Sequence, residues 1–368
     1  MRKSQLVFII AFLLCITVQA SLCLGSDYFF DVDLWSTGAL HMSEVGLPSP
    51  NAPEYGYPGI SILAPASLLI SLGAPPRLAT QAVVLIWVSL LVALITVLAY
   101  VLRPQSNWYL ALGGLLLLSR IYLQATPPSS LVTLFVTLLV LLFLYAFENR
   151  NLLKPYVFIG IAGGVALSTR FDISFLVLGF GLLFLSFWSF RNALIAGVVT
   201  LIAFCLTNSY MFFEPVSHLT HIFQRVYHTS NIIGGEEGHG PLIYRLVRSL
   251  PLGFFSILFA LVLLITKYEL PFRRVFLYWL LFISFVIEGA LLATKFHADW
   301  YFYPILVLWQ SLLPLFLLSI VKKDIIFPPP LKNISPRAFS WFIVGSLIGS
   351  QVIVFFHPAL MVSLTISL

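Results

Sequence analysis

The chain has 368 residues, of which 60% are hydrophobic and 9% are charged, and its mean hydropathy is +1.00. Soluble domains carry about 25% charged residues, so the composition excludes an ordinary soluble protein. The formal net charge of +6 has to be interpreted by side of the membrane and gives no reason to expect a nucleic-acid partner.

Apolar runs of membrane-spanning length recur along the chain, without the alternating polarity of transmembrane strands. They predict an all-α polytopic membrane protein with about eleven transmembrane helices in a single integral membrane domain, residues 1–368. The first run favours an uncleaved span, although Val18-Gln-Ala20 also fits a signal-peptide cleavage pattern. The expected spans are 5–24, 79–102, 107–124, 129–147, 154–169, 173–189, 191–213, 249–267, 273–293, 301–320 and 338–362.

The short apolar segment Gly59–Gly73 decides the orientation of every later helix. If it does not span, most Lys and Arg residues fall on one face, as the positive-inside rule expects for the cytoplasm. We therefore expect this segment to lie at the outer surface or to dip in and out. The outer face then carries two long loops, 25–78 (with this juxtamembrane segment) and 214–248, and it gathers most of the acids and histidines.

The first outer loop contains Asp31-Val-Asp33, in a region without Lys or Arg from Ser4 to Pro76. Two carboxylates at this spacing can share a divalent cation, or one can act as a general base while the other orients water. A solvated acidic loop would have the same spacing. The histidines and cysteines have no supporting ligand pattern, so no metal centre is predicted beyond a cation at Asp31 and Asp33.

Three more outer segments carry candidate residues. Arg170-Phe171-Asp172 is either an interfacial pair with a function or a local ion pair between two helices. Lys295 is either a lysine that meets a lipid phosphate or one that snorkels to the interface. The loop 214–248, with Arg225 and His239, suits the binding of phosphate or sugar hydroxyls.

These motifs, in this order and on one face, resemble the GT-C membrane glycosyltransferases, in particular the family 39-like group of protein O-mannosyltransferases and lipid A aminoarabinose transferases. The spacing of Asp31 from Ala39, Met42 and Gly46 makes Asp31, rather than Asp33, the match for the catalytic acid. The other matching segments are Tyr57-Pro58-Gly59, Arg170-Phe171-Asp172, Gly238-His239-Gly240-Pro241 and Lys295 to Pro304.

Two positions depart from the family pattern. The connection 125–130 lacks the second acid that many relatives carry, so Asp33 or another outer acid would have to take that role. In the register set by Tyr301, His297 stands in the place of the lysine, and Lys295 comes two positions earlier.

The resemblance implies inverting transfer of a sugar from a polyprenyl or dolichyl phosphate to a glycan, lipid or protein acceptor on the outer or luminal face. The membrane would be the plasma (inner) membrane of a prokaryote or the endoplasmic reticulum of a eukaryote. The implied site has catalytic acids Asp31 and Asp33, donor-phosphate ligands Lys295, Arg170 and Arg225, and pocket residues His239, Tyr57, Asp172, His297 and Tyr301.

Two other functions fit the same composition. A transporter or flippase for lipid-linked sugars is one, although few polar residues are expected at the midplane, where transporters bind their substrates. A catalytically inactive relative that binds lipid as a scaffold is the other, because a fold does not determine function.

Overall fold

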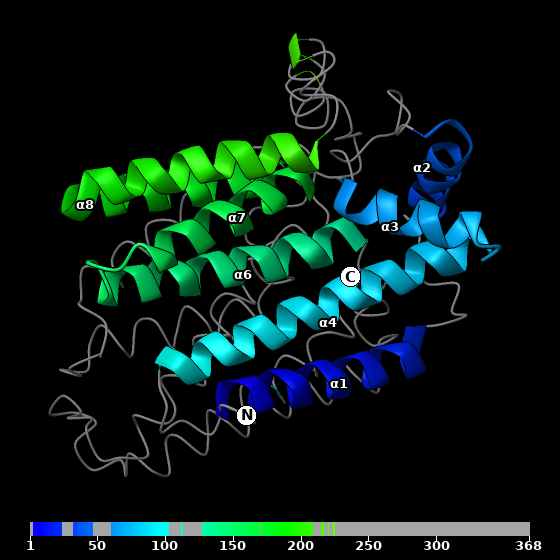
Figure 1. Cartoon of the computed structure of the whole chain (residues 1–368), viewed down its shortest axis with the longest axis horizontal. Helices are drawn as coiled ribbons and strands as arrows, with labels where there is room; N and C mark the ends of the chain where they lie inside the picture. The colour runs from blue at the N-terminus through cyan, green and yellow to red at the C-terminus, as the bar shows by residue number, and fades with distance from the viewer. Residues whose placement is uncertain are drawn as a thin grey trace, which may run out of the picture.

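A computed structural model of the chain describes residues 3–23, 32–46, 60–102, 112, 127–169, 171–208, 215, 216, 220 and 224. All regular structure within these residues is helical, as the sequence predicts (Figure 1). The helices are α1 (Lys3–Cys23), α2 (Val32–Val45), α3 (Ile60–Ser71), α4 (Pro76–Leu102), α6 (Pro127–Glu148), α7 (Lys154–Thr169) and α8 (Phe171–Thr207).

The long helices lie side by side in the order α1, α4, α6, α7, α8, while α2 and α3 sit together at one end of this bundle (Figure 1). Three stretches of described helix are long and apolar enough to cross a bilayer: Lys3–Ala20, Pro76–Leu102 and Val177–Thr207, the last of which contains the break at Ser189. The first two match the predicted spans 5–24 and 79–102. Helix α6 has 22 residues, which gives it a length of about 33 Å and also suffices to cross the hydrocarbon layer.

Helix α8 is a hairpin rather than one long span. Its helical conformation breaks at Ser189, where φ is −154° and ψ is 80°. The two halves then pack on each other, since a Cβ on Gly197 would lie 3.9 Å from Leu182. The break agrees with the prediction of two helices here, 173–189 and 191–213, although α8 ends at Thr207 and residues 209–213 lie outside the described residues.

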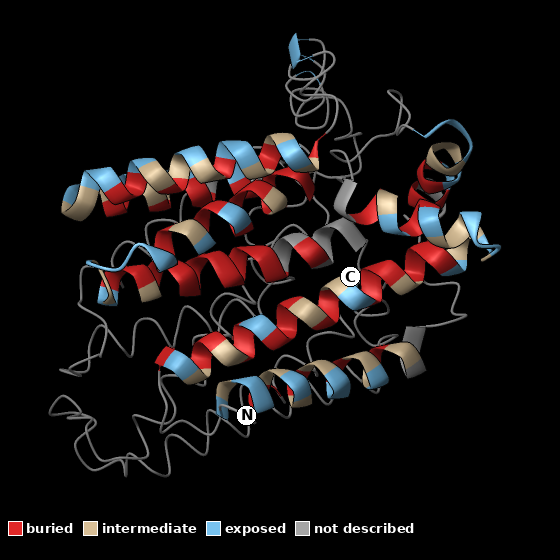
Figure 2. Cartoon of the chain, in the orientation of Figure 1, coloured by how far each residue is buried: buried red, intermediate tan, exposed pale blue. Residues whose placement is uncertain are grey.

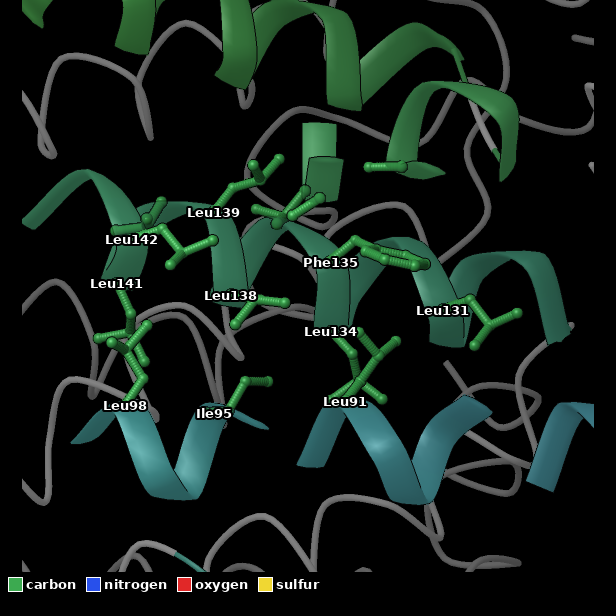
Figure 3. Close-up of a cluster of buried hydrophobic side chains, with 14 of the residues drawn as sticks. Leu91, Ile95, Leu98, Leu131, Leu134, Phe135, Leu138, Leu139, Leu141 and Leu142 are labelled. Atoms are coloured by element: carbon green, nitrogen blue, oxygen red, sulfur yellow. The ribbon is translucent and has the colours of Figure 1, made fainter. Parts of the chain in front are cut away.

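The packing of α4 against α6 shows how the spans hold together. Leu91, Ile95 and Leu98 of α4 face Leu134 and other apolar side chains of α6 (Figure 3). These positions recur at i, i+4 and i+7, which places them on one face of a helix. The residues of α6 that are labelled in this cluster are Leu131, Leu134, Phe135, Leu138, Leu139, Leu141 and Leu142.

Burial separates the central helix of the described bundle from its edges (Figure 2). Helix α6 contacts α4, α7 and α8, and its residues from Leu134 to Leu144 are all buried. A helix that is apolar all round belongs inside a bundle. Helices α1 and α8 each keep an exposed apolar face, which suits contact with acyl chains.

Glycines let α7 approach the second half of α8 closely. A Cβ on Gly160 would stand 2.5 Å from the Cβ of Val199, and one on Gly164 would stand 2.5 Å from the Cβ of Ala203. These two glycines are four residues apart, on one face of α7. This is the small-residue spacing that brings membrane helices together without a hydrophobic driving force.

The short helices α2 and α3 both end at a glycine in the left-handed region. Gly46 has a φ of 79°, and its N–H donates to the carbonyl of Met42 at 2.9 Å. Gly73 has a φ of 94°. Its N–H donates to the carbonyl of Ile70, and the N–H of Ala74 donates to the carbonyl of Leu69. Both are standard helix C-caps, and only glycine takes up such a conformation without strain.

Helix α3 supports the prediction that Gly59–Gly73 does not cross the membrane. It has 12 residues, so its length is about 18 Å, well short of the hydrocarbon thickness of about 30 Å. It then turns at Gly73 and packs on α4. The predicted spans 107–124, 249–267, 273–293, 301–320 and 338–362 lie outside the described residues, apart from Leu112.

Candidate functional site

The end of the bundle that carries α2 and α3 also carries the start of α8 (Figure 1). Two predicted site residues, Asp33 and Asp172, are each the second residue of their helices, α2 and α8, so their backbones both lie at this end. The elements that hold them differ, because α2 packs on α3 and α4, whereas α8 packs on α6 and α7.

Buried apolar side chains fix α2 in place directly after the Asp31-Val-Asp33 segment. Trp35 is 1% exposed and Ala39 is fully buried. Gly38 lies on the same side, where a Cβ would meet the side chain of Leu63 in α3 at 3.6 Å. Because Trp35 is buried, rotation of the first turn of α2 would uncover a large side chain, which opposes movement of the segment that carries Asp33.

The end of α7 and the first turns of α8 carry buried small polar residues. The hydroxyls of Ser168 and Thr169 donate to the carbonyl of Val165, at 2.8 and 2.9 Å. Ser174, in the first turns of α8, is fully buried, and its hydroxyl has no hydrogen-bond partner in the part of the chain that the structure describes. Asn208, just beyond the second half of α8, is 5% exposed.

Charge divides the two ends of the described bundle. Four of its cations, Lys3, Arg150, Lys154 and Arg191, lie at the end away from α2 and α3, and Arg77 lies at the α2 and α3 end. The backbones of Asp33 and Asp172 lie at this same end as Arg77, as does Glu44 in α2. Glu148, the last residue of α6, is the one described acid at the end with the four cations. The excess of cations at that end follows the pattern that the sequence predicts for the two faces of the membrane.

Most predicted site residues lie outside the described residues, so their placement stays a prediction. They are Asp31, Tyr57, Arg170, Arg225, His239, Lys295, His297 and Tyr301. For Asp33 and Asp172 the structure describes the helical backbone, at the start of α2 and of α8.

The described residues contain no group of three or more His, Cys, Asp or Glu that could hold a metal ion. Asp31 is not among them, so the divalent cation at Asp31 and Asp33 remains a prediction. Carboxylate oxygens are suitable ligands for a hard cation, but two alone leave most of its coordination to water or substrate.

Sequence reasoning missed two features of this end. It treated residues 25–57 as a loop, whereas α2 is a helix with Trp35, Ala39 and Met42 on one side. The spacing of i, i+4 and i+7 among these residues was the available signal. It also passed over Ser174 and Asn208, whose only sequence signal is a polar residue near the end of an apolar helix.

No protein-family model matches this sequence, and no characterised protein matches it by sequence. A solved structure, ArnT from Cupriavidus metallidurans bound to undecaprenyl phosphate, matches the fold with a TM-score of 0.54 at 13% sequence identity. The match covers 97% of this chain and 72% of that chain. The chain is therefore an integral membrane protein, and the likeness supports a GT-C-like fold.

Proposed function

We propose that this protein is an inverting glycosyltransferase that moves a sugar from a polyprenyl or dolichyl phosphate to an acceptor at the membrane surface. The observation that carries the proposal is the likeness to ArnT along 97% of the chain, because that structure contains undecaprenyl phosphate. A donor of this class needs an apolar groove for its tail and a polar pocket near the interface for its phosphate. A helical membrane bundle can supply both.

We assign the reaction to the end of the bundle that carries α2 and α3. Helix α2 begins one residue after Asp31 and is anchored by Trp35, so a rigid element adjoins the preferred base. The same end carries the start of α8, next to Arg170 in the sequence. Catalysis requires groups held within a fraction of an ångström, and packed helices achieve this better than free loops.

The proposed chemistry assigns one role to each class of residue. The carboxylate of Asp31 takes the proton from the acceptor hydroxyl as its oxygen attacks C1 of the sugar from the face opposite the phosphate. The bond between C1 and the phosphate oxygen breaks, and the polyprenyl phosphate leaves with the bonding electrons. Cations at Lys295, Arg170 and Arg225 would stabilise the charge that grows on this phosphate.

The remaining pocket residues would orient the two substrates. His239, Tyr57, Asp172, His297 and Tyr301 carry hydrogen-bonding groups suited to sugar hydroxyls. Because 125–130 contains no carboxylate, Asp33 takes the role of the second acid in this scheme. A divalent cation shared by Asp31 and Asp33 would bind the donor phosphate and add positive charge at the leaving group.

The distribution of cations supports an orientation for the protein. Lys3, Arg150, Lys154 and Arg191 would lie at the cytoplasmic face, with α2 and α3 on the outer or luminal side. The acceptor, whether glycan, lipid or protein, would then be glycosylated outside the plasma membrane or inside the endoplasmic reticulum.

Transfer measured with purified protein in proteoliposomes tests the proposal. The donors are synthetic polyprenyl-phosphate sugars, and both glycosyl products and free polyprenyl phosphate are measured. Release of polyprenyl phosphate that depends on the protein supports a transferase, because this step breaks the bond between sugar and phosphate. Movement of intact donor across the vesicle membrane without release would instead show a flippase, and donor binding without either would show an inactive scaffold.

A further inference from the structure

Helix α1 is held by one narrow row of side chains. Among the described helices its main contact is α4, and it lies alongside that helix at the edge of the described bundle (Figure 1). The buried residues within 3–20 recur every four positions, at Val7, Ala11, Cys15 and Gln19. Residues at this spacing lie on the same side of a helix. The position of α1 therefore depends on what this row contributes to the contact with α4.

The row changes from apolar to polar along the helix. Val7 and Ala11 form the half nearer the start of α1, whereas Cys15 and Gln19 form the half that approaches the end carrying α2 and α3 (Figure 1). Buried apolar area stabilises the first half. Burial of an amide costs free energy unless new hydrogen bonds replace those to water. The contact with α4 is therefore stronger in the first half of α1 than in the second.

The polar side chains of the second half are poorly paired. Gln19 and Ser89 of α4 are fully buried, and the amide atoms and the hydroxyl have no hydrogen-bond partner within the described residues. Both side chains are neighbours of the Cys15 thiol, which thus lies between α1 and α4. A thiol is only a weak donor and acceptor, so it replaces little of the hydration that the other two groups lose. Closure of this half of the contact therefore costs free energy.

Gln19 also lies close to the membrane surface. It is four residues before Cys23, the last residue of α1, which corresponds to about 6 Å along the helix axis. If α1 moves away from α4 at this end, interfacial water reaches the amide and restores its hydrogen bonds. Separation at Val7 and Ala11 would expose apolar side chains and bring no such gain. The arrangement favours movement about the apolar half.

We propose that α1 pivots about Val7 and Ala11 and separates from α4 at Cys15, Gln19 and Ser89, which opens a lateral entrance for the tail of a lipid-phosphate donor. The entrance lies at the proposed catalytic end, where the chain continues from α1 towards α2. A polyprenyl tail stays in the bilayer, so it enters the bundle between helices. The role as donor entrance rests on the proposed glycosyl transfer, whereas the movement of α1 does not.

Thiol labelling in proteoliposomes tests the movement. In a full-length protein with Cys23→Ser and Cys205→Ser, Cys15 is the single thiol, and it is buried while α1 is closed. Mass spectrometry measures its rate of reaction with membrane-permeant N-ethylmaleimide. Gln19→Leu removes the poorly paired amide and should slow this reaction about tenfold. The matched control is Gln5→Leu, the same change at an exposed position of α1, which should leave the rate unchanged.

Two labelling results would overturn the pivot. One is an equal rate with and without Gln19→Leu. The other is no reaction of the native protein under conditions in which the unfolded protein reacts.

A reversible cross-link tests the entrance. In the same background Ser89→Cys places a second thiol beside Cys15, and oxidation with copper phenanthroline joins the two and holds α1 on α4. Native mass spectrometry then measures binding of undecaprenyl phosphate, the probe lipid. The oxidised protein should lose at least tenfold in affinity and regain it after reduction, which also controls for folding. Ser89→Ala should not respond to the oxidant.

The outcomes of this experiment separate the entrance from the proposed reaction. Undiminished binding by the cross-linked protein would overturn the entrance, and failure of the two thiols to join would contradict the contact between Cys15 and Ser89. Binding that the cross-link blocks, in a protein that transfers no sugar, would support the entrance and contradict the proposed glycosyl transfer.

Discussion

The close approach of α7 and α8 predicts that a single methyl group at Gly164 destabilises the bundle. In Gly164→Ala the new Cβ would stand 2.5 Å from the Cβ of Ala203, 2.6 Å from the backbone nitrogen of Phe204 and 2.7 Å from the carbonyl oxygen of Thr200. Two of these atoms belong to the backbone, so no change of rotamer relieves the overlap, and the helices must separate. Overpacking of this kind costs about 1–3 kcal/mol, partly offset by about 0.5–1 kcal/mol of improved helix propensity.

The matched control is Gly179→Ala, in the first half of α8, where a Cβ would meet nothing within 4 Å. Alanine improves the helix propensity there without an overlap, so this variant should be as stable as the wild type or slightly more stable. Thermal unfolding in detergent, followed by circular dichroism, compares the two. Gly164→Ala should unfold at the lower temperature. It should also lose sugar transfer, because Arg170, a proposed ligand of the donor phosphate, directly follows α7 in the sequence. Equal melting temperatures for the two variants would refute the proposed packing.

Three further substitutions test other parts of the structure. Trp35→Ala removes a side chain that is 1% exposed and should lower the free energy of unfolding by about 3–5 kcal/mol, whereas Leu40→Ala, on the exposed side of α2, should have a small effect. Gln19→Leu should raise the free energy of unfolding by about 1–3 kcal/mol, because both polar atoms of this fully buried amide have no hydrogen-bond partner within the described residues. A lower melting temperature of this variant would instead show that the amide of Gln19 makes a stabilising hydrogen bond. Gly73→Ala should lower the free energy of unfolding by about 1 kcal/mol, because alanine is strained at a φ of 94°. Chemical denaturation measures this change, and an unchanged free energy of unfolding would contradict the C-cap described for α3.

The spans could be predicted well because length and apolar composition are local properties of the chain. The predicted 154–169 coincides with α7, and 129–147 and 79–102 differ from α6 and α4 by a few residues at their ends. The two helices of the α8 hairpin were also predicted, although the single break at Ser189 is tighter than a usual connection.

Helix α2 could not be predicted with the same ease, because its stability comes from tertiary contacts. It has 14 residues of mixed polarity, and isolated helices of this length are marginal in water. Burial of Trp35 and Ala39 against α3 and α4 stabilises it. The contact of Gly160 and Gly164 with α8 was equally hidden, since the glycines are visible in the sequence but their partners are not.

The candidate site shows the same difference between features that are local in the sequence and features that depend on tertiary contacts. Its acids and cations were chosen by motif and by sidedness, and the structure places the helix starts that carry Asp33 and Asp172 at the same end of the bundle. The buried hydroxyl of Ser174 became visible only through burial and its missing hydrogen bond. Contacts that join residues distant in sequence carry this information, and a single sequence does not reveal them.

The most direct test of the proposed function measures sugar transfer from a synthetic polyprenyl-phosphate donor by the wild type, Asp31→Asn and Asp33→Asn. All three proteins are reconstituted in equal amounts after their folding has been checked by thermal unfolding. If Asp31 is the general base, Asp31→Asn should lower the transfer rate by about 10²- to 10⁴-fold at unchanged stability, and Asp33→Asn should have the smaller effect. Full transfer activity in a correctly folded Asp31→Asn protein would contradict this assignment.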